Sequence, residues 1–205
     1  KDIYEKKLDN VRIINIGDDE LPEEIDLINL ACNLLIQGKV IGWFQGRMEW
    51  GPRALGNRSI IGDPRNSEMQ NILNSKIKRR ESFRPFAPSV LKNHAMDWFE
   101  MIDKSDNNVP FMMKVFPIKK EKRNKIPAVC HVDGTGRLQT VSKENNGRYY
   151  KLINRFYELT GVPMILNTSF NENEPIVGSI SEAYECFKRT KMDALIIENK
   201  MLLRT

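Results

Sequence analysis

The chain has 205 residues, 40% of them hydrophobic and 29% charged, with a net charge of +5. This length and composition suit one large domain, or a domain with an extension, and argue against wholesale disorder. The longest apolar runs, such as VPMIL and ALII, are too short to span a bilayer, so a membrane protein is excluded.

Periodicity and turn residues predict alternating helices and strands along the chain. Helices are indicated where apolar residues recur close to every 3.6 residues, as from Ile25 to Leu35 before Gly38. Ser179 and Glu182 have the spacing of a capping box. In chain order we expect a helix over 21–39, a strand over 39–45, helices over 63–78 and 93–101, strands over 128–133 and 137–142 around a GTG turn, a helix over 147–161, a strand over 162–170, a helix over 181–190 and a last strand over 193–199.

This alternation predicts an α/β or α+β domain built around a mixed sheet. We expect one domain over residues 21–205, with residues 1–20 as a lead-in from a preceding domain. A second weak point in the pattern is the basic run Lys114–Lys125, which holds six Lys/Arg against one Asp/Glu. This run lacks glycine and apolar periodicity, so it is expected to be a solvated loop or mobile tip.

The cysteines and histidines limit the chemistry that the chain offers. Cys32, Cys130 and Cys186 are isolated and odd in number, which favours a reducing cytoplasm over a disulfide framework or a structural zinc site. With only His94 and His131 present, we expect no histidine-rich metal centre.

The stretch GRMEWGPRALGNRS, residues 46–59, follows a predicted buried strand and carries Arg47, Arg53 and Arg58. Guanidinium groups are planar forks of donors suited to phosphate or carboxylate, and the glycines allow a close backbone approach to a ligand. Glu49 is expected to orient one of the arginines. Pro52 stands where a Walker A loop requires lysine, so that motif is excluded. The alternative is a structural knot of salt bridges.

Three further polar segments extend the candidate site. KIKRRESFRPFAP ends in a rigid path between Pro85 and Pro88, LNTSFNENEP places hydroxyls and amides after a predicted strand, and HVDGTGR forms a tight turn. Each has a plainer interpretation, as helix-end charges, an Asx turn or a packed histidine. The residues singled out in these segments are Lys78, Arg80, Arg84, His131, Asp133, Thr135, Arg137, Asn167, Thr168, Ser169 and Asn171.

Taken together, these segments offer many Arg/Lys donors, few carboxylates and no credible pair of nucleophile and base. That combination suits binding and activation of phosphates by electrostatics better than hydrolysis by acid–base chemistry.

Four motifs occur in the order GRMEWGPRALGNRSIIGDPR, KRRESFRPFAPSVL, HVDGTGRLQTV and TGVPMILNTSFNENEPIV. In this order they closely resemble the C-terminal domain of the NodU/CmcH-type O-carbamoyltransferases, over roughly residues 24–200. The resemblance implies a YrdC-like fold, since Lys78 to Arg80 is similar to the KxR of YrdC proteins and NTSFN to their STSAN. Asn173 and the terminal MLLRT depart from the family pattern.

The resemblance also implies a function. Such a domain binds ATP and carbamoyl phosphate, with Mg²⁺ assisting, and forms carbamoyl-adenylate. An N-terminal ASKHA-type domain with a metal site then passes the carbamoyl group to an acceptor hydroxyl. The resemblance assigns catalytic roles to Lys78, Arg80, Arg137 and Ser169, and binding roles to Arg47, Arg53, Arg58, Arg84, His131, Asp133, Thr135, Asn167, Thr168 and Asn171.

Three alternatives stay open at this point. An RNA-binding module would suit the net charge, but Trp43, Trp50, Phe83 and Phe86 adjoin apolar runs and are expected in the core. A threonylcarbamoyl-AMP synthase would share the chemistry and use threonine and bicarbonate. A degenerate domain would only support its catalytic partner.

Overall fold

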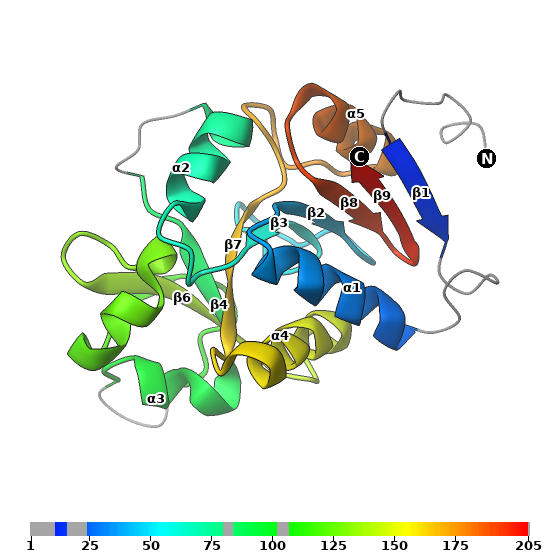
Figure 1. The fold of residues 1–205 in the computed structure, drawn as a ribbon. Helices are drawn as coiled ribbons and strands as arrows, with labels where there is room; N and C mark the ends of the chain where they lie inside the picture. Colours follow the sequence, from blue (N-terminus) through cyan, green and yellow to red (C-terminus); the bar gives the residue numbers. More distant parts are fainter. Residues whose placement is uncertain (1–10, 16–23, 80–83, 102–106, 205) are drawn as a thin grey trace.

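The computed structural model describes residues 11–15, 24–79, 84–101 and 107–204 (Figure 1). Within these ranges nine strands form one mixed sheet in the order β1-β9-β8-β2-β3-β7-β4-β6-β5, which confirms the expected class. The strands are β1 (Val11–Asn15), β2 (Ile41–Phe44), β3 (Arg58–Gly62), β4 (Ala87–Leu91), β5 (Lys114–Pro117), β6 (Thr135–Val141), β7 (Met164–Ser169), β8 (Ala194–Ile197) and β9 (Lys200–Arg204). The α-helices are α1 (Glu24–Ile36), α2 (Met69–Leu73), α3 (Ala95–Trp98), α4 (Gly147–Thr160) and α5 (Ile180–Arg189).

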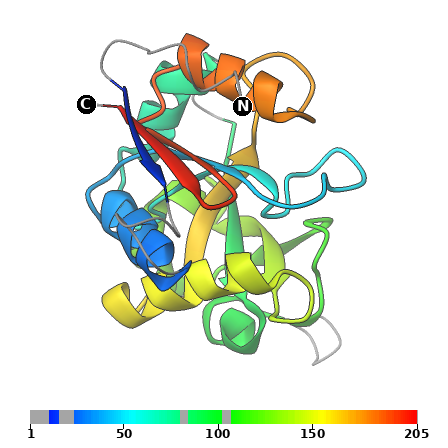
Figure 2. The same ribbon diagram turned by 90° about the vertical axis from the view of Figure 1, so that its right-hand side faces the viewer.

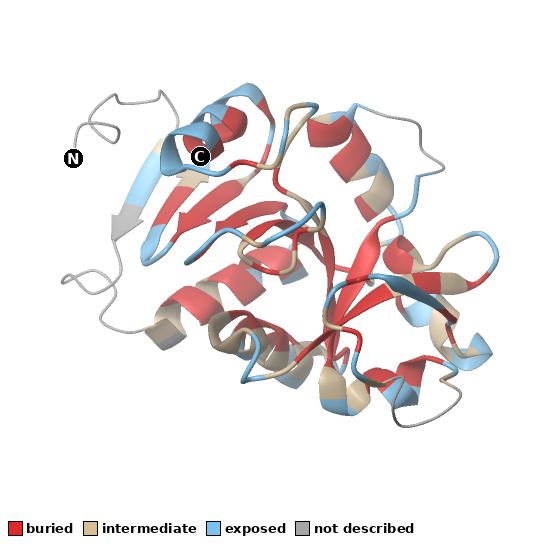
Figure 3. Ribbon diagram, turned by 180° about the vertical axis from the view of Figure 1, so that it is seen from behind, coloured by how far each residue is buried: buried red, intermediate tan, exposed pale blue. Residues whose placement is uncertain are grey.

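Helices cover the sheet from both sides. In Figure 2, α1 and α4 lie side by side below the sheet, and α2 and α5 lie above it. Large side chains fill the space between the layers, and Trp43, Tyr149, Phe156 and Phe187 are all fully buried there. Figure 3 shows burial concentrated along the central strands. Among the described residues, no helix is long and apolar enough to cross a membrane.

The ends of α4 and α5 follow from their capping residues. The side chain of Asn146 accepts a hydrogen bond from the backbone N–H of Tyr149, and Gly161 ends α4 with a left-handed φ of 72°. Ser179 and Glu182 form both hydrogen bonds of a capping box at the start of α5, as predicted.

Several strands escape the sequence analysis because pairing, and not a local pattern, holds them. β3 begins with a buried arginine and β4 contains Pro88, and neither shows the alternation expected of a strand. β1, from the segment expected as a lead-in, pairs antiparallel with β9. β9 itself follows the tight turn at Glu198 and Asn199, so 193–199 does not hold the last strand.

Three predicted elements differ from the structure. The helix expected over 63–78 begins only at Met69, because the Asp63 carboxylate accepts hydrogen bonds from the backbone and side chain of Arg65 and shapes a turn. It then continues as a π-helical turn, Asn74–Lys78. The strand expected over 128–133 is wrong, since Pro127–Val129 is a 3₁₀ turn.

The partner of β6 comes from the basic run instead. Residues Lys114–Pro117 form β5 and pair antiparallel with β6, and Lys120–Lys125 form a 3₁₀ helix. The expectation of a solvated loop is therefore wrong. Phe116 of β5 is buried while its neighbours are exposed, so a single apolar anchor and backbone pairing suffice to order a highly charged segment.

The sheet register brings the predicted motifs to one edge. β7 pairs antiparallel with β3, placing Ser169 opposite Ser59, and antiparallel with β4, placing Asn167 opposite Ala87. β4 pairs parallel with β6, so the start of β6 lies beside the start of β4. The C-terminal end of β7 therefore meets the β2–β3 loop and the first residues of β4 and β6.

Candidate functional site

The central feature of this edge is a cavity of about 100 Å³ between four of the predicted segments. Its wall takes residues from the β2–β3 loop, the segment before β4, the start of β6 and the end of β7. The lining residues are Pro52, Arg53, Ala54, Pro85, Phe86, Ala87, Met112, Arg137, Asn167, Thr168 and Ser169. Positions up to 117 residues apart in sequence thus share one small polar chamber, which we call the arginine cavity.

Two arginines supply the positive charge of the arginine cavity. Arg53 comes from the β2–β3 loop and Arg137 from β6. The Nε of Arg53 is buried and has no hydrogen-bond partner among the described residues. No carboxylate belongs to the described lining. A positive chamber whose described lining holds no carboxylate is suited to an anionic group, because the hydrogen bonds that such a group accepts here are charge-assisted.

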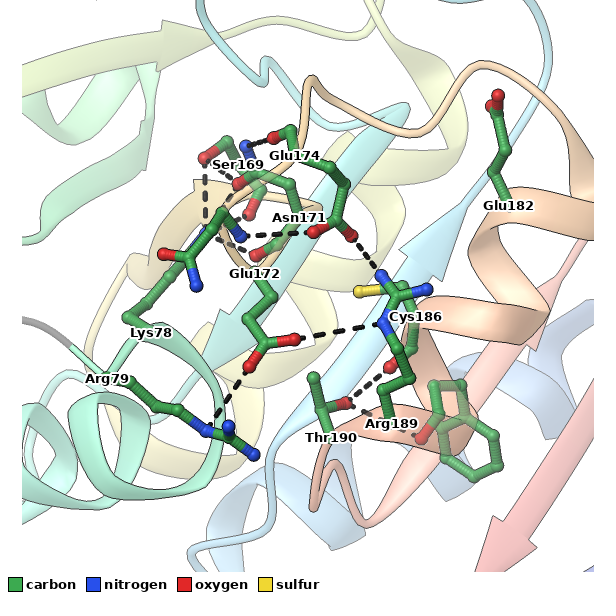
Figure 4. A network of polar contacts seen from close by, with 12 residues as sticks. Lys78, Arg79, Ser169, Asn171, Glu172, Glu174, Glu182, Cys186, Arg189 and Thr190 are labelled. Atoms are coloured by element: carbon green, nitrogen blue, oxygen red, sulfur yellow. Dashed lines mark hydrogen bonds and ion pairs between the residues drawn. The ribbon is translucent and has the colours of Figure 1, made fainter.

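Lys78 organises the loop after β7 (Figure 4). Its side chain is only 4% exposed, and its Nζ lies 2.8 Å from the Ser169 carbonyl oxygen and 2.7 Å from both the carbonyl oxygen and Oδ1 of Asn171. The Ser169 hydroxyl donates to Asn171 Oδ1 at 2.7 Å and lies 3.3 Å from Nζ. Lys78 therefore holds the Ser169 side chain in place at the cavity wall.

The π-helical turn explains how Lys78 reaches this loop. The turn ends at Arg79, which has a left-handed φ of 43°. Outside the turn, Arg79 pairs with Glu172 at 3.2 Å, and Glu172 also faces Arg189. Arg79 and Arg189 are exposed and lie around the loop in Figure 4, whereas the Lys78 side chain is buried beside Ser169 and Asn171. A π-turn adds a residue to the helix and so redirects the side chains at its end.

Arg58 lies elsewhere than the sequence suggested. Its guanidinium is 4% exposed and donates to the carbonyl oxygens of Gln45, Gly46 and Asn57 at 2.7–3.1 Å. It also stacks over the Phe44 ring at 3.5 Å. Burial lowers the pKa of Arg58. This arginine closes the base of the β2–β3 loop, so it supports the arginine cavity without lining it.

Glu49 also has a different role from the one expected. Its Oε1 accepts hydrogen bonds from the backbone N–H groups of Leu55, Asn57 and Arg58. The carboxylate therefore fixes the loop backbone and does not orient an arginine side chain. The shape of the loop here depends on one carboxylate oxygen that accepts from three backbone N–H groups within four residues.

A buried polar network lies beneath the loop. The Asn167 side-chain Nδ2 donates to the Ala54 carbonyl and to Ser89 Oγ, both at 3.0 Å. Ser89 Oγ donates to Gln139 Oε1 at 2.6 Å, and Gln139 Nε2 donates to the Leu55 carbonyl at 2.9 Å. Sequence analysis missed Ser89 and Gln139. The only available indication was the two-residue spacing of Gln139 from Arg137, which puts both on one face of β6.

The turn before β6 forms its own small network. Thr135 Oγ1 donates to Asp133 Oδ1 at 2.7 Å, so its hydroxyl oxygen accepts from Nδ1–H of His131 at 3.0 Å. Burial lowers the pKa of His131, the charge of Arg137 acts in the same direction, and Asp133 opposes them. Hydrogen bonds from Thr135 lower the pKa of Asp133. These three residues do not belong to the described lining of the arginine cavity.

The remaining predicted residues are dispersed. Arg47 and Arg84 are exposed and do not belong to the described lining, and Asn171 stands behind Ser169. Arg80 lies outside the described residues, as does Phe83. Trp43 and Phe86 are buried as expected, but Trp50 is fully exposed, because it occupies the tip of the β2–β3 loop where no other element covers it.

A larger cavity of about 480 Å³ adjoins the arginine cavity. The two cavities are lined by adjacent residues of the same segments. Ala54 and Met112 line the arginine cavity, and their neighbours Leu55 and Phe111 line the larger one. The described lining of this larger cavity includes the carboxylate of Glu49 and five amide side chains, namely Asn57, Asn108, Gln139, Asn145 and Asn146. We call this space the amide cavity.

Comparisons with protein-family models and with known proteins agree on one family. Residues 32–204 match the family model described as carbamoyltransferase C-terminus. The nodulation protein NolNO of Sinorhizobium fredii is 49% identical over 178 residues, which cover 86% of this chain and 26% of that protein. NolO of Bradyrhizobium diazoefficiens is 49% identical over 173 residues, covering 84% and 31%. The chain thus spans roughly a quarter to a third of the length of the curated relatives it matches.

Two solved structures share the fold. Full-length HypF in its phosphate- and nucleotide-bound form matches with a TM-score of 0.59 at 18% identity, covering 84% of this chain and 25% of that one. Sua5 of P. abyssi complexed with L-threonine matches with a TM-score of 0.59 at 16% identity, covering 86% and 48%. The expected YrdC-like fold is confirmed.

Proposed function

Because this chain belongs to the carbamoyltransferase C-terminal family, we propose that it binds carbamoyl phosphate and ATP and forms carbamoyl-adenylate. An N-terminal ASKHA-type domain of the same polypeptide then transfers the carbamoyl group to an acceptor hydroxyl, in the cytoplasm. The observation that carries this proposal is the arginine cavity, where Arg53, Arg137 and Ser169 meet in a described lining that contains no carboxylate.

The size of the arginine cavity supports a small acyl group. Drug-sized ligands occupy pockets of about 300–1,000 Å³, whereas this one measures about 100 Å³. A carbamoyl group or a single phosphate matches it, and a nucleoside needs a second space. The amide cavity provides that space directly beside it, with amides to pair with a base and an exposed Phe111 ring to stack on it.

The proposed reaction is a displacement at phosphorus. Water first hydrolyses the mixed anhydride of carbamoyl phosphate, which breaks the bond between its carbamoyl and phosphate groups and gives phosphate and carbamate. An oxygen of the carbamate then attacks the α-phosphorus of ATP. The bond from the α-phosphorus to the bridging oxygen breaks, and pyrophosphate departs with the electron pair. Arg53 and Arg137 neutralise the charge that grows on the phosphoryl oxygens, and fixed donors at this position lower the barrier without rearranging.

Lys78 and Ser169 position the reacting groups in this proposal. The Lys78 ammonium is committed to the loop after β7, so it contributes its positive field and holds Ser169 at the wall. The Ser169 hydroxyl donates to Asn171 Oδ1, and its oxygen lies 3.3 Å from Lys78 Nζ. When ligand binds, the hydroxyl can exchange Asn171 Oδ1 for an acceptor on the ligand.

Mg²⁺ does not fit the described wall of the arginine cavity as a protein-bound ion. The described wall of the arginine cavity contains no carboxylate, and Mg²⁺ prefers oxygen ligands of that kind. Any Mg²⁺ would come with the phosphates of ATP, and we assign it no step.

Isotope exchange between pyrophosphate and ATP tests the proposal. The 205-residue chain should catalyse exchange only with carbamoyl phosphate present, and Arg53→Ala should lower kcat/KM by about 10–150-fold, the loss of one charge-assisted hydrogen bond. The matched control is Arg47→Ala, an exposed arginine of the same loop outside the cavity lining. No exchange with carbamoyl phosphate, but exchange with L-threonine and bicarbonate, would transfer the assignment to threonylcarbamoyl-adenylate formation.

A further inference from the structure

The orientation of the Asn167 side-chain amide is fixed by its neighbours. Its nitrogen faces the carbonyl oxygen of Ala54 at 3.0 Å, and a carbonyl can only accept. Gln139 is fixed in the same way, since its nitrogen faces the Leu55 carbonyl, so its Oε1 accepts from Ser89 and lies 3.3 Å from Asn167 Nδ2. Neither amide can be turned over without placing two acceptors together.

The remaining atom of this amide is therefore an acceptor. Asn167 Oδ1 is buried and has no hydrogen-bond partner among the described residues, and the residue as a whole is 1% exposed. Buried polar atoms in native proteins nearly always have a partner, so an orphan at a cavity wall indicates a ligand donor. Asn167 lines the arginine cavity together with Ala54, the residue that fixes its orientation.

The arginines of the wall are donors, while the hydroxyls of Thr168 and Ser169 can donate or accept. Guanidinium groups such as those of Arg53 and Arg137 can only donate. The arginine cavity thus offers donors from one part of its wall and a fixed amide oxygen from another. A complementary ligand is small and planar, with oxygen acceptors and one N–H donor.

We propose that Asn167 Oδ1 selects the amino group of the carbamoyl donor and so distinguishes it from acyl phosphates that lack an N–H. The inference rests on the proposed function and adds the residue that sets its specificity. A carbamoyl group and an acetyl group have nearly the same size, so the arginines and the cavity volume do not separate them. The orphan acceptor does, because a methyl group would leave it unpaired.

The test compares two acyl donors in the 205-residue chain. ATP–pyrophosphate exchange is measured with carbamoyl phosphate and with acetyl phosphate, and the ratio of the two kcat/KM values is the readout. The natural chain should favour carbamoyl phosphate at least tenfold, the usual effect of a missing hydrogen bond to a buried site group. Asn167→Leu removes the acceptor with little change of volume and should bring the ratio close to one.

Ser89→Ala is the matched control. It removes a hydrogen bond from the same network but belongs to the described lining of neither cavity, so stability should fall while the ratio stays high. If Ser89→Ala lowers the ratio as much as Asn167→Leu, selection does not depend on Oδ1 and the inference is overturned. If Asn167→Leu does not fold, the ratio of kcat/KM values in the natural chain is the test, and a ratio close to one overturns the inference.

The outcomes separate this inference from the proposed function. Equal exchange with acetyl phosphate and carbamoyl phosphate overturns the role of Asn167 and leaves adenylate formation standing. Exchange with neither donor overturns the proposed function, and the inference with it. A high ratio that Asn167→Leu abolishes and Ser89→Ala preserves supports both.

Discussion

The most direct prediction concerns Lys78, whose buried ammonium donates hydrogen bonds to the loop after β7. Lys78→Met keeps most of the side-chain volume and removes the charge. Three acceptors lie within 2.8 Å of Nζ, and an ammonium has three protons to give them. Each hydrogen bond from a charged donor contributes about 1.5–3 kcal/mol, and atoms left unpaired add to the loss.

We therefore expect Lys78→Met to lower the free energy of unfolding by about 3–5 kcal/mol, because three buried neutral acceptors lose their charged donor. Against a total of about 5–15 kcal/mol, this is a large fraction. Urea unfolding, followed by the fluorescence of the buried Trp43, measures the change. The folded variant should also lose ATP–pyrophosphate exchange in the absence of urea, because Lys78 no longer holds the Ser169 side chain at the cavity wall.

The neighbouring lysine provides the control. Lys76 belongs to the same π-helical turn, but its side chain is 30% exposed and pairs with Asp193 at 3.0 Å. Lys76→Met should change stability by no more than about 1 kcal/mol, as for other surface pairs. If Lys78→Met is equally mild, the buried contacts of Lys78 do not organise the loop, and our account of the site is refuted.

Three further predictions concern the elements around the site. Gly56→Ala should destabilise the chain by about 2–4 kcal/mol in urea unfolding, because φ is +108° and a Cβ would collide with the Tyr149 ring; an unchanged midpoint would contradict this packing. Hydrogen bonds from Lys151 and Arg148 lower the pKa of Glu24. The natural chain should therefore have a larger free energy of unfolding than Glu24→Gln above pH 4.5, and this difference should disappear as the pH falls below that value. A difference that grows in acid would contradict the pairing. Burial lowers the pKa of His131, so the neutral imidazole should contribute to the free energy of unfolding above pH 6.5. This contribution should be lost as the pH falls through the lowered pKa. His131→Asn should flatten this part of the pH–stability profile, and an unaltered profile would refute this role of His131.

The positions of the long helices and of strands β2, β6, β7 and β8 were accessible from the sequence. The amphipathic pattern of α4, the Gly161 cap and the capping box of α5 are local features, and each predicted its element correctly. β5 and β3 were not accessible in this way. They carry exposed or charged residues and exist because a neighbouring strand supplies their hydrogen bonds.

The site shows the same division. Arg53, Arg137 and Ser169 could be singled out because their residue types, after predicted strands and within recognisable motifs, indicate anion binding. Arg58 has the same residue type and the same loop, yet its donors bind main-chain carbonyls. Nothing in the residue type distinguishes a guanidinium that faces a ligand from one that faces backbone.

By itself the sequence determined which side chains could serve an anion site and which segments would carry them, because composition and short-range spacing are properties of neighbours along the chain. The tertiary structure alone decided which groups meet. Lys78 reaches Ser169 across 91 positions, and Asn167 is left with an unpaired oxygen only once the strands are in register. Hydrogen-bond partners between distant segments depend on that register, which no local pattern records.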